Sequence, residues 1–135
     1  MASRDDMNCA IKAVVIPHLR RLEFKGSMPH FRCSRAEAMD LLSFQFRSGG
    51  GSFVIELARV HLEGFDFHGR HIPASKANVT YCNAMQRYRL GAPLPPERGD
   101  HWFDFATNDP DIVARDVCVW LDRPDVWSAI NLLEI

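Results

Sequence analysis

The chain has 135 residues, 47% of them hydrophobic and 24% charged, and its formal net charge is −1 at pH 7. This length suits a single domain over residues 1–135 that folds without a disulfide or a metal, and the composition excludes a disordered or fibrous chain. Because a charge so close to zero creates no field that gathers nucleic acid or an anionic membrane surface, we expect neither as a partner.

The first predicted element is an amphipathic helix over residues 5–23. Ser3, followed three residues later by Asp6, resembles a capping box. Pro17 lies inside this helix and lacks a backbone N–H, so it predicts a kink or a locally loosened turn. Gly26 is the expected end of the helix. The apolar stripe at helical spacing consists of Ile11, Val14, Val15, His18, Leu19 and Leu22.

A β-hairpin over residues 39–61 is the predicted centre of the fold. Apolar and polar residues alternate through residues 39–47 and 52–62, and the glycines at 49–51 allow the positive φ angles of a reversal. A short strand over residues 28–35 precedes the hairpin. The apolar set of its second strand changes phase so that Arg59 falls on the formerly buried face, which we interpret as a one-residue bulge near Leu57 or Ala58.

Residues 61–78 predict a loop or a small irregular hairpin, because glycines and a proline interrupt them. Residues 79–90 predict an extended strand with Cys82, Ala84, Tyr88 and Leu90 on one face. A Pro-rich surface loop follows over residues 91–99, and residues 101–105 predict a short aromatic strand.

Two helices are expected at the C-terminal end. Asn108 or Asp109 caps the first, with Pro110 in its first turn, and the second, a short helix or a turn, begins at Pro124. The first helix has a predicted buried stripe of Ile112, Val113, Val117, Trp120 and Leu121, and the second carries Val126, Trp127, Ile130 and Leu133. Together the elements predict an α+β fold, with a central antiparallel sheet of about five strands packed against the N-terminal helix and the C-terminal helices.

Landmarks follow a fixed order along nearly the whole chain: Leu22, Phe24 and Lys25; Phe31 and Arg32; Phe44, Phe46 and Arg47; Gly51 and Phe53; Cys82; Arg87, Arg89, Leu90 and Gly91; Asp100, Trp102 and Phe103. Their order resembles a family of small, mostly bacterial domains of unknown function, domain-of-unknown-function family four-three-zero-four. One departure is Glu23, at a position where we expect a glycine. The resemblance implies an α+β fold with a central antiparallel sheet, and it implies no reaction.

Arg87 and Arg89 are the leading candidates for a binding site. Residues two apart on a strand point the same way, so the two guanidinium groups could clamp a carboxylate or a phosphate. Asp100 and Asp104, on the segment expected beside this strand, offer another interpretation, in which arginine–carboxylate pairs hold the sheet together. We favour the structural pairing.

Two neighbours extend this candidate site. Trp102 and Phe103 point to opposite faces of their strand, so Trp102 could be exposed beside the arginines, with the composition of a protein-binding hot spot. His101 is the histidine that could act together with Arg87 and Arg89 on an anionic substrate.

No catalytic or metal-binding set is predicted. His61, His68, His71 and Cys82 could in principle gather around zinc, but their spacing matches no signature, and we favour exposed loop histidines. No serine or cysteine lies in a nucleophile motif, and the glycines at 49–51 lack the lysine of a phosphate loop. We therefore expect no catalytic residue, no metal and no cofactor.

The sequence favours a non-enzymatic protein-binding domain, with an immunity-like or accessory role as its concrete version. The alternative is a small enzyme or ligand-binding domain that acts on a carboxylate or phosphate substrate. Self-association through a sheet edge is a third possibility. The start of the chain lacks the features of a secretory signal and no apolar run approaches the length of a membrane span, so we expect a cytoplasmic location.

Overall fold

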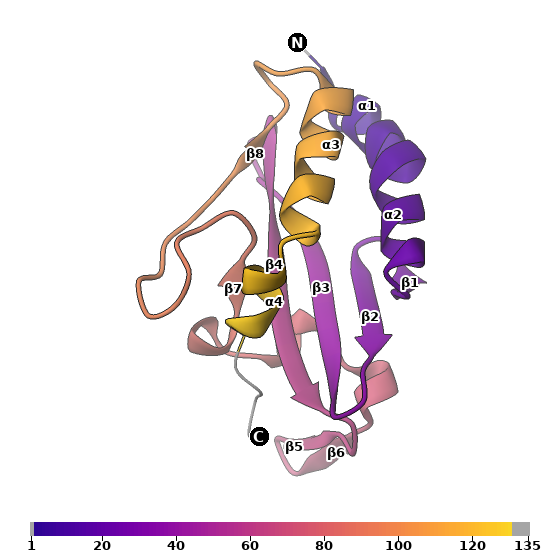
Figure 1. The fold of residues 1–135 in the computed structure, drawn as a ribbon, viewed down its shortest axis with the longest axis vertical. Coiled ribbons are helices and arrows are strands. Elements are labelled where there is room, and N and C mark those ends of the chain that lie inside the picture. The colour runs from indigo at the N-terminus through magenta and orange to yellow at the C-terminus, as the bar shows by residue number, and fades with distance from the viewer. Residues whose placement is uncertain (1, 131–135) are drawn as a thin grey trace.

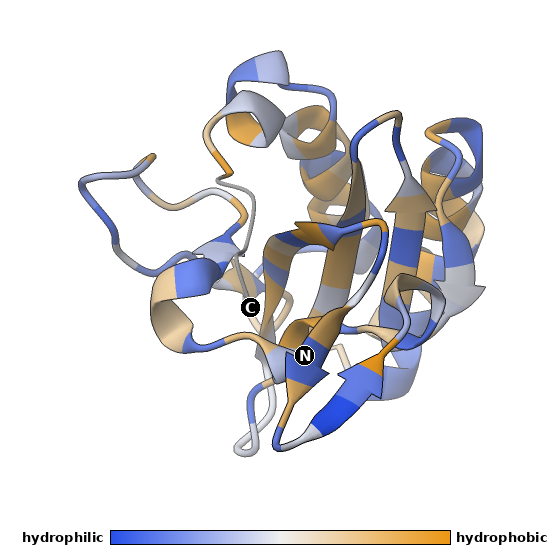
Figure 2. Ribbon diagram, turned by 90° about the horizontal axis from the view of Figure 1, so that it is seen from below, coloured by the Kyte–Doolittle hydropathy of each residue, from blue (hydrophilic) through white to orange (hydrophobic). Residues whose placement is uncertain are grey.

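A computed structural model describes residues 2–130 of the chain, and it has the predicted α+β architecture. Six strands form an antiparallel sheet in the order β1-β2-β3-β4-β7, with β8 also paired to β4. The helices α1, α2 and α3 lie side by side against one face of this sheet (Figure 1). Figure 2 shows the hydrophobic residues gathered on the central strands and on the helices that face them, while the outer loops are largely hydrophilic.

The N-terminal helix consists of α1 (Arg4–Ala10), a π-helical turn (Ile11–Val15) and α2 (Ile16–Arg21). The predicted capping box is present, because Asp6 N donates to Ser3 Oγ and Ser3 N donates to the Asp6 carboxylate. The π-helical turn lies directly before Pro17, where a loosened turn is predicted. A π turn widens the backbone next to a residue that has no N–H to donate.

The helix ends at Glu23 and not at Gly26. Glu23 has a φ of 71°, in the left-handed region. Its N–H donates to Arg20 O and the next N–H, of Phe24, donates to Leu19 O, which is the Schellman pattern of helix termination. The predicted end at Gly26 is therefore wrong, and Gly26 lies in β1 (Lys25–Ser27). Glu23 adopts the conformation that glycine accepts most readily, at the position where a glycine is expected.

The central hairpin forms as predicted from β3 (Ala38–Phe46) and β4 (Ser52–His61), preceded by β2 (His30–Ser34). The pairing of β3 with β4 runs without interruption from Ala38 opposite His61 to Phe46 opposite Phe53. The predicted bulge near Leu57 or Ala58 is therefore wrong. The change of phase has another cause, because both faces of the sheet are covered at the end of the hairpin that lies far from its turn.

Each face of the sheet has its own hydrophobic core. The helices cover Leu42, Phe44, Phe53, Ile55 and Leu57, while residues 65–82 cover Met39, Leu41, Ala58 and Val60 on the other face. That second cover is made of the hairpin β5 (Phe65–Phe67) and β6 (Arg70–Ile72), followed by the short helical turns Ala74–Lys76 and Val79–Tyr81. The irregular hairpin expected within residues 61–78 is confirmed.

The predicted strand over residues 79–90 is wrong for most of its length. The chain forms short 3₁₀ turns at Val79–Tyr81 and Ala84–Gln86, and only β7 (Tyr88–Arg89) pairs with β4. Asn78 and Asn83 start these turns, because each side-chain oxygen accepts from backbone N–H groups ahead of it. Such side-chain caps compete with the strand ladder for the backbone.

The predicted strand over residues 101–105 is shorter in the structure, where β8 comprises Phe103–Asp104. The helix α3 (Pro110–Leu121) is capped by Asp109, and α4 (Pro124–Ser128) begins at the predicted proline. Ile112 is 56% exposed, so its predicted place in the buried stripe is wrong. Leu133 lies outside the described residues. No helix within residues 2–130 has both the length and the apolar character needed to cross a bilayer.

Candidate functional site

The predicted arginine pair lies on the face of the sheet opposite the helices, where β7 joins β4. Arg89 stands directly opposite Glu56 of β4 in the ladder. Arg87 precedes the strand and projects to the same face, and its Nε donates to Cys82 O at 2.8 Å. The alternation that predicts a shared direction for Arg87 and Arg89 is correct, although the strand that carries it is only two residues long.

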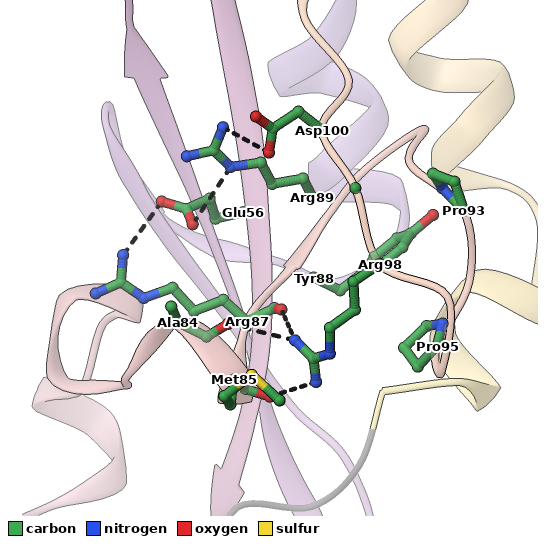
Figure 3. Close-up of a pocket in the computed structure, with 11 residues that line it drawn as sticks. Glu56, Ala84, Met85, Arg87, Tyr88, Arg89, Pro93, Pro95, Arg98 and Asp100 are labelled. Atoms are coloured by element: carbon green, nitrogen blue, oxygen red, sulfur yellow. Dashed lines mark hydrogen bonds and ion pairs between the residues drawn. The ribbon is translucent and has the colours of Figure 1, made fainter.

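A buried carboxylate holds the two arginines together (Figure 3). Glu56 is 7% exposed, and its Oε1 lies 3.3 Å from Arg87 Nη1 while its Oε2 lies 3.9 Å from Arg89 Nε. Arg89 Nη1 lies 3.1 Å from Asp100 Oδ1. A buried carboxylate needs cationic or hydrogen-bonded partners to offset its lost hydration. Both arginines therefore have a structural role.

A pocket of about 440 Å³ opens beside these ion pairs. Arg98 enters it from the Pro-rich loop and donates to the carbonyl oxygens of Ala84, Met85 and Arg87. Figure 3 shows the guanidinium groups of Arg87 and Arg89 on either side of Glu56, while that of Arg98 lies apart from them, against the backbone of the 3₁₀ turn. The charged residues of the pocket lining are Arg87, Arg89, Arg98, Glu56 and Asp100, so the pocket carries one net positive charge.

Trp102 lies next to this pocket and is 41% exposed. The Cζ atom of Arg89 lies 5.5 Å from the centre of the Trp102 ring, which is a cation–π distance. Arg89 thus contacts Glu56, Asp100 and Trp102 at once. We call Arg89, Asp100 and Trp102 the Trp102 surface.

His101 points away from the Trp102 surface. Its ring centre lies 4.8 Å from that of Phe103 and 6.0 Å from that of Trp120 on α3, so it packs on the helix side. A Cβ atom at Gly91 would lie 2.4 Å from His101 Cδ2, which shows how closely the backbone covers this ring. Of the five candidates, the structure brings Arg87, Arg89, Asp100 and Trp102 together and places His101 elsewhere.

Asp104 does not pair with the arginines. Its side chain accepts from Ala106 N and Thr107 Oγ1, both at 2.7 Å, and closes the turn that follows β8. These hydrogen bonds lower the pKa of the Asp104 carboxyl, with the Thr107 hydroxyl as the largest cause. The structural pairing expected of Asp100 is present, and that expected of Asp104 is absent.

Three residues of the site lie outside the sequence prediction: Glu56, Met85 and Arg98. Glu56 carries a signal in the sequence, because it is the one charged residue in the apolar run of residues 53–58. The alternation of β4 places it on the face opposite Leu57, which the helices cover. Recognising Arg89 as its partner needs the register between β4 and β7.

A polar row crosses four strands at this level of the sheet. His30, Ser43, Glu56 and Arg89 stand opposite one another in sequence across β2, β3, β4 and β7. His30 Nδ1 lies 2.7 Å from Ser43 Oγ. The row borders the second hydrophobic core on the side toward the glycine turn.

Within residues 2–130, no group of three or more His, Cys, Asp or Glu side chains is arranged to hold a metal ion. His71 Nδ1 lies 3.3 Å from Asp66 Oδ1 on the β5–β6 hairpin. Cys82 belongs to the second core, and burial raises the pKa of its thiol to about 11. A protonated thiol is a poor ligand and a poor nucleophile at neutral pH.

Comparison with known proteins identifies a family. The sequence profile of a family described as Domain of unknown function (DUF4304) matches residues 14–127, which include the second core, most of the first core and the arginine cluster. No curated protein and no solved structure matches the chain.

Proposed function

We propose that the chain, which belongs to the DUF4304 family of domains of unknown function, is a non-enzymatic protein-binding domain with an immunity-like or accessory role. It contacts its partner through the Trp102 surface. The observation that carries this proposal is the 41% exposure of Trp102 over the guanidinium of Arg89. Tryptophan and arginine are the residues most enriched at the energetic centres of protein interfaces.

The ion pairs around Arg89 favour binding in two ways. Asp100 and Glu56 already pair with its guanidinium. Burying this compensated charge under another protein therefore costs less desolvation free energy than burying an unpaired one. The same contacts hold the side chain in place before a partner arrives, which lowers the conformational entropy lost on association. The Trp102 surface is thus organised in the free protein.

The test compares two exposed apolar residues in the same affinity experiment. Tagged wild-type chain, Trp102→Ala and Ile112→Ala are each used to capture partners from the source lysate, with quantitative mass spectrometry as the readout. Ile112 is the matched control, because it is 56% exposed on α3 at the other side of the molecule. We expect one stoichiometric partner with wild type and Ile112→Ala, reduced at least tenfold with Trp102→Ala.

The immunity version has a separate test. Cells that express the chain are challenged with a toxin encoded beside it, and survival is compared between wild type and Trp102→Ala. The proposal is rejected if no stoichiometric partner is captured and no protection is seen. It is also rejected if Trp102→Ala retains both activities in full.

A second candidate function follows from the three guanidinium groups that line the 440 Å³ pocket, which could bind a carboxylate or phosphate ligand. This version predicts that Arg89→Ala abolishes the chemical-shift changes caused by inorganic phosphate or small dicarboxylates while the melting temperature stays nearly unchanged. If Arg89→Ala instead lowers the melting temperature by several degrees, Arg89 serves the fold. The pairing of Arg89 with Glu56 and Asp100 favours that second outcome.

A further inference from the structure

The strand β3 extends beyond the strand that pairs with it on one side. Its pairing with β2 ends at His30 opposite Ser43, after which Phe44 N–H donates to Pro29 O at 2.9 Å. β3 continues to Phe46 on the way to the glycine turn.

The direction of the backbone groups on this extension follows from the ladder. In an antiparallel pair, each residue directs its N–H and C=O to one side, and successive residues alternate. Arg47 N–H donates to Ser52 O of the hairpin partner, so Phe44 and Phe46 direct their groups to the opposite side. Pro29 has no N–H to donate to Phe44 C=O. Within residues 2–130, no hydrogen bond engages the backbone of Phe46 on this side.

These groups face a groove of about 720 Å³ between β3 and the N-terminal helix. Its apolar wall is formed by Ile16, Met28 and the ring of Phe46. One face of the helix, at residues 5, 8, 9, 12 and 16, forms the other side. The volume lies in the usual range of sites that hold a ligand or part of a peptide.

The rim of the groove is positively charged. Arg4 and Lys12 oppose a single carboxylate, Asp5, and neither cation takes part in an ion pair within the described part of the chain. The Cζ atom of Arg4 lies 4.4 Å from the centre of the Phe46 ring, at the end of the groove. Two cations beside an open strand edge favour an acidic occupant.

We propose that this groove binds an extended, acidic segment of a partner protein, which adds to the sheet as a strand beside β3 residues 44–46. Its backbone would pair with Phe44 C=O, Phe46 N–H and Phe46 C=O. Because alternate residues of a strand share a face, an apolar side chain would enter beside Ile16 and Met28, and an acidic side chain two positions away would approach Lys12. This surface is separate from the Trp102 surface, so the two proposals can fail independently.

The experiment uses the intact chain and a displayed library of random seven-residue peptides. We expect the selected peptides to share an apolar residue followed two positions later by Asp or Glu. Lys12→Glu should weaken their binding about five- to tenfold in fluorescence anisotropy, since it reverses an exposed charge at the rim. Lys76→Glu is the matched control, because Lys76 is an exposed lysine outside the groove. That variant and Trp102→Ala should both bind like wild type.

Two further measurements require no amino-acid substitution. Cys9 is the exposed cysteine of the groove, so its alkylation by N-ethylmaleimide should block peptide binding. Amide hydrogen exchange should show new protection at Phe46 N–H in the complex and no change at Gln45, which pairs with Val54.

Four results would overturn the proposal. The first is a selection that enriches no common pattern, and the second is full binding by the alkylated protein. The third is unchanged exchange at Phe46. In the fourth, light scattering shows a dimer that alkylation of Cys9 dissociates, which would assign the groove to a second copy of the chain.

Discussion

Replacing Arg59 by methionine should cost about 3 kcal/mol of folding free energy, although the residue lies far from either proposed surface. Arg59 is opposite Asp40 in the ladder, and its Nε lies 2.6 Å from Asp40 Oδ1. Its two other nitrogens donate to Trp127 O and Ile130 O, at 3.1 and 3.0 Å. One guanidinium therefore serves a carboxylate that is 2% exposed and joins the C-terminal segment to the sheet.

The magnitude follows from what remains after the substitution. Removing one partner of a buried ion pair costs about 3–5 kcal/mol, because the other charge stays buried without compensation. We expect the lower end, because Arg35 Nε still lies 3.2 Å from the second oxygen of Asp40. Replacing both members, by Asp40→Leu with Arg59→Met, removes the uncompensated charge. The double variant should be no less stable than Arg59→Met alone. If Asp40→Leu alone costs about 2 kcal/mol, because it leaves Arg59 without its carboxylate, the coupling energy is then at least about 2 kcal/mol.

Urea unfolding of the wild type, the two single variants and the double variant measures this coupling. Arg115→Met is the control, since Arg115 is exposed on α3 and should change the unfolding free energy by less than about 0.5 kcal/mol. A cost below about 1 kcal/mol for Arg59→Met, or single-variant effects that simply add in the double variant, would refute the assignment of Arg59 as the partner of a buried charge.

Three smaller predictions concern the backbone and a buried thiol. Glu23→Gly should stabilise the chain by about 0.5–1 kcal/mol in urea unfolding, because it relieves a left-handed residue, whereas Glu23→Ala should give no gain. Gly64→Ala should cost clearly more than Gly69→Ala: both residues have positive φ angles, but only at Gly64 would a Cβ meet a backbone oxygen, that of Ile72, at 2.3 Å. Burial raises the pKa of the Cys82 thiol from 9.0 to about 11, so the unfolded state loses this proton at a lower pH than the folded state. The free energy of unfolding should therefore fall as the pH rises from about 9 to 11, and it should fall less in Cys82→Ala.

The hairpin at the centre of the fold could be predicted because its signal is local. The alternation through residues 39–47 and the glycines at 49–51 depend on nothing else in the chain. The phase change near Arg59 could not be interpreted in the same way. It arises because residues 65–82 cover the second face at one end of the hairpin, and no pattern within β4 reveals a cover supplied by a later segment.

Part of the arginine cluster, the shared direction of Arg87 and Arg89, could be predicted because its signal is also local. Spacing alone places Arg87 and Arg89 on one face, but Glu56 becomes their partner only through the long-range pairing of β7 with β4. The placement of His101 could have been predicted, because it shares a face with Phe103, whose apolar ring belongs to the helix side.

Both proposed surfaces have the same structural origin. Residues 65–82 cover the second face only near the far end of the β3–β4 hairpin, and the pairing of β3 with β2 ends at Ser43. Toward the glycine turn, the hairpin therefore lacks the cover of residues 65–82 on one face, where Val54 is nonetheless buried, and it lacks a neighbouring strand along its β3 edge. On the β4 side, β7 and β8 occupy the edge, and Trp102 is the large apolar side chain that stays exposed there. On the β3 side, α1 stands across a groove from open backbone groups, an arrangement that hinders pairing with another folded sheet while leaving room for a single strand.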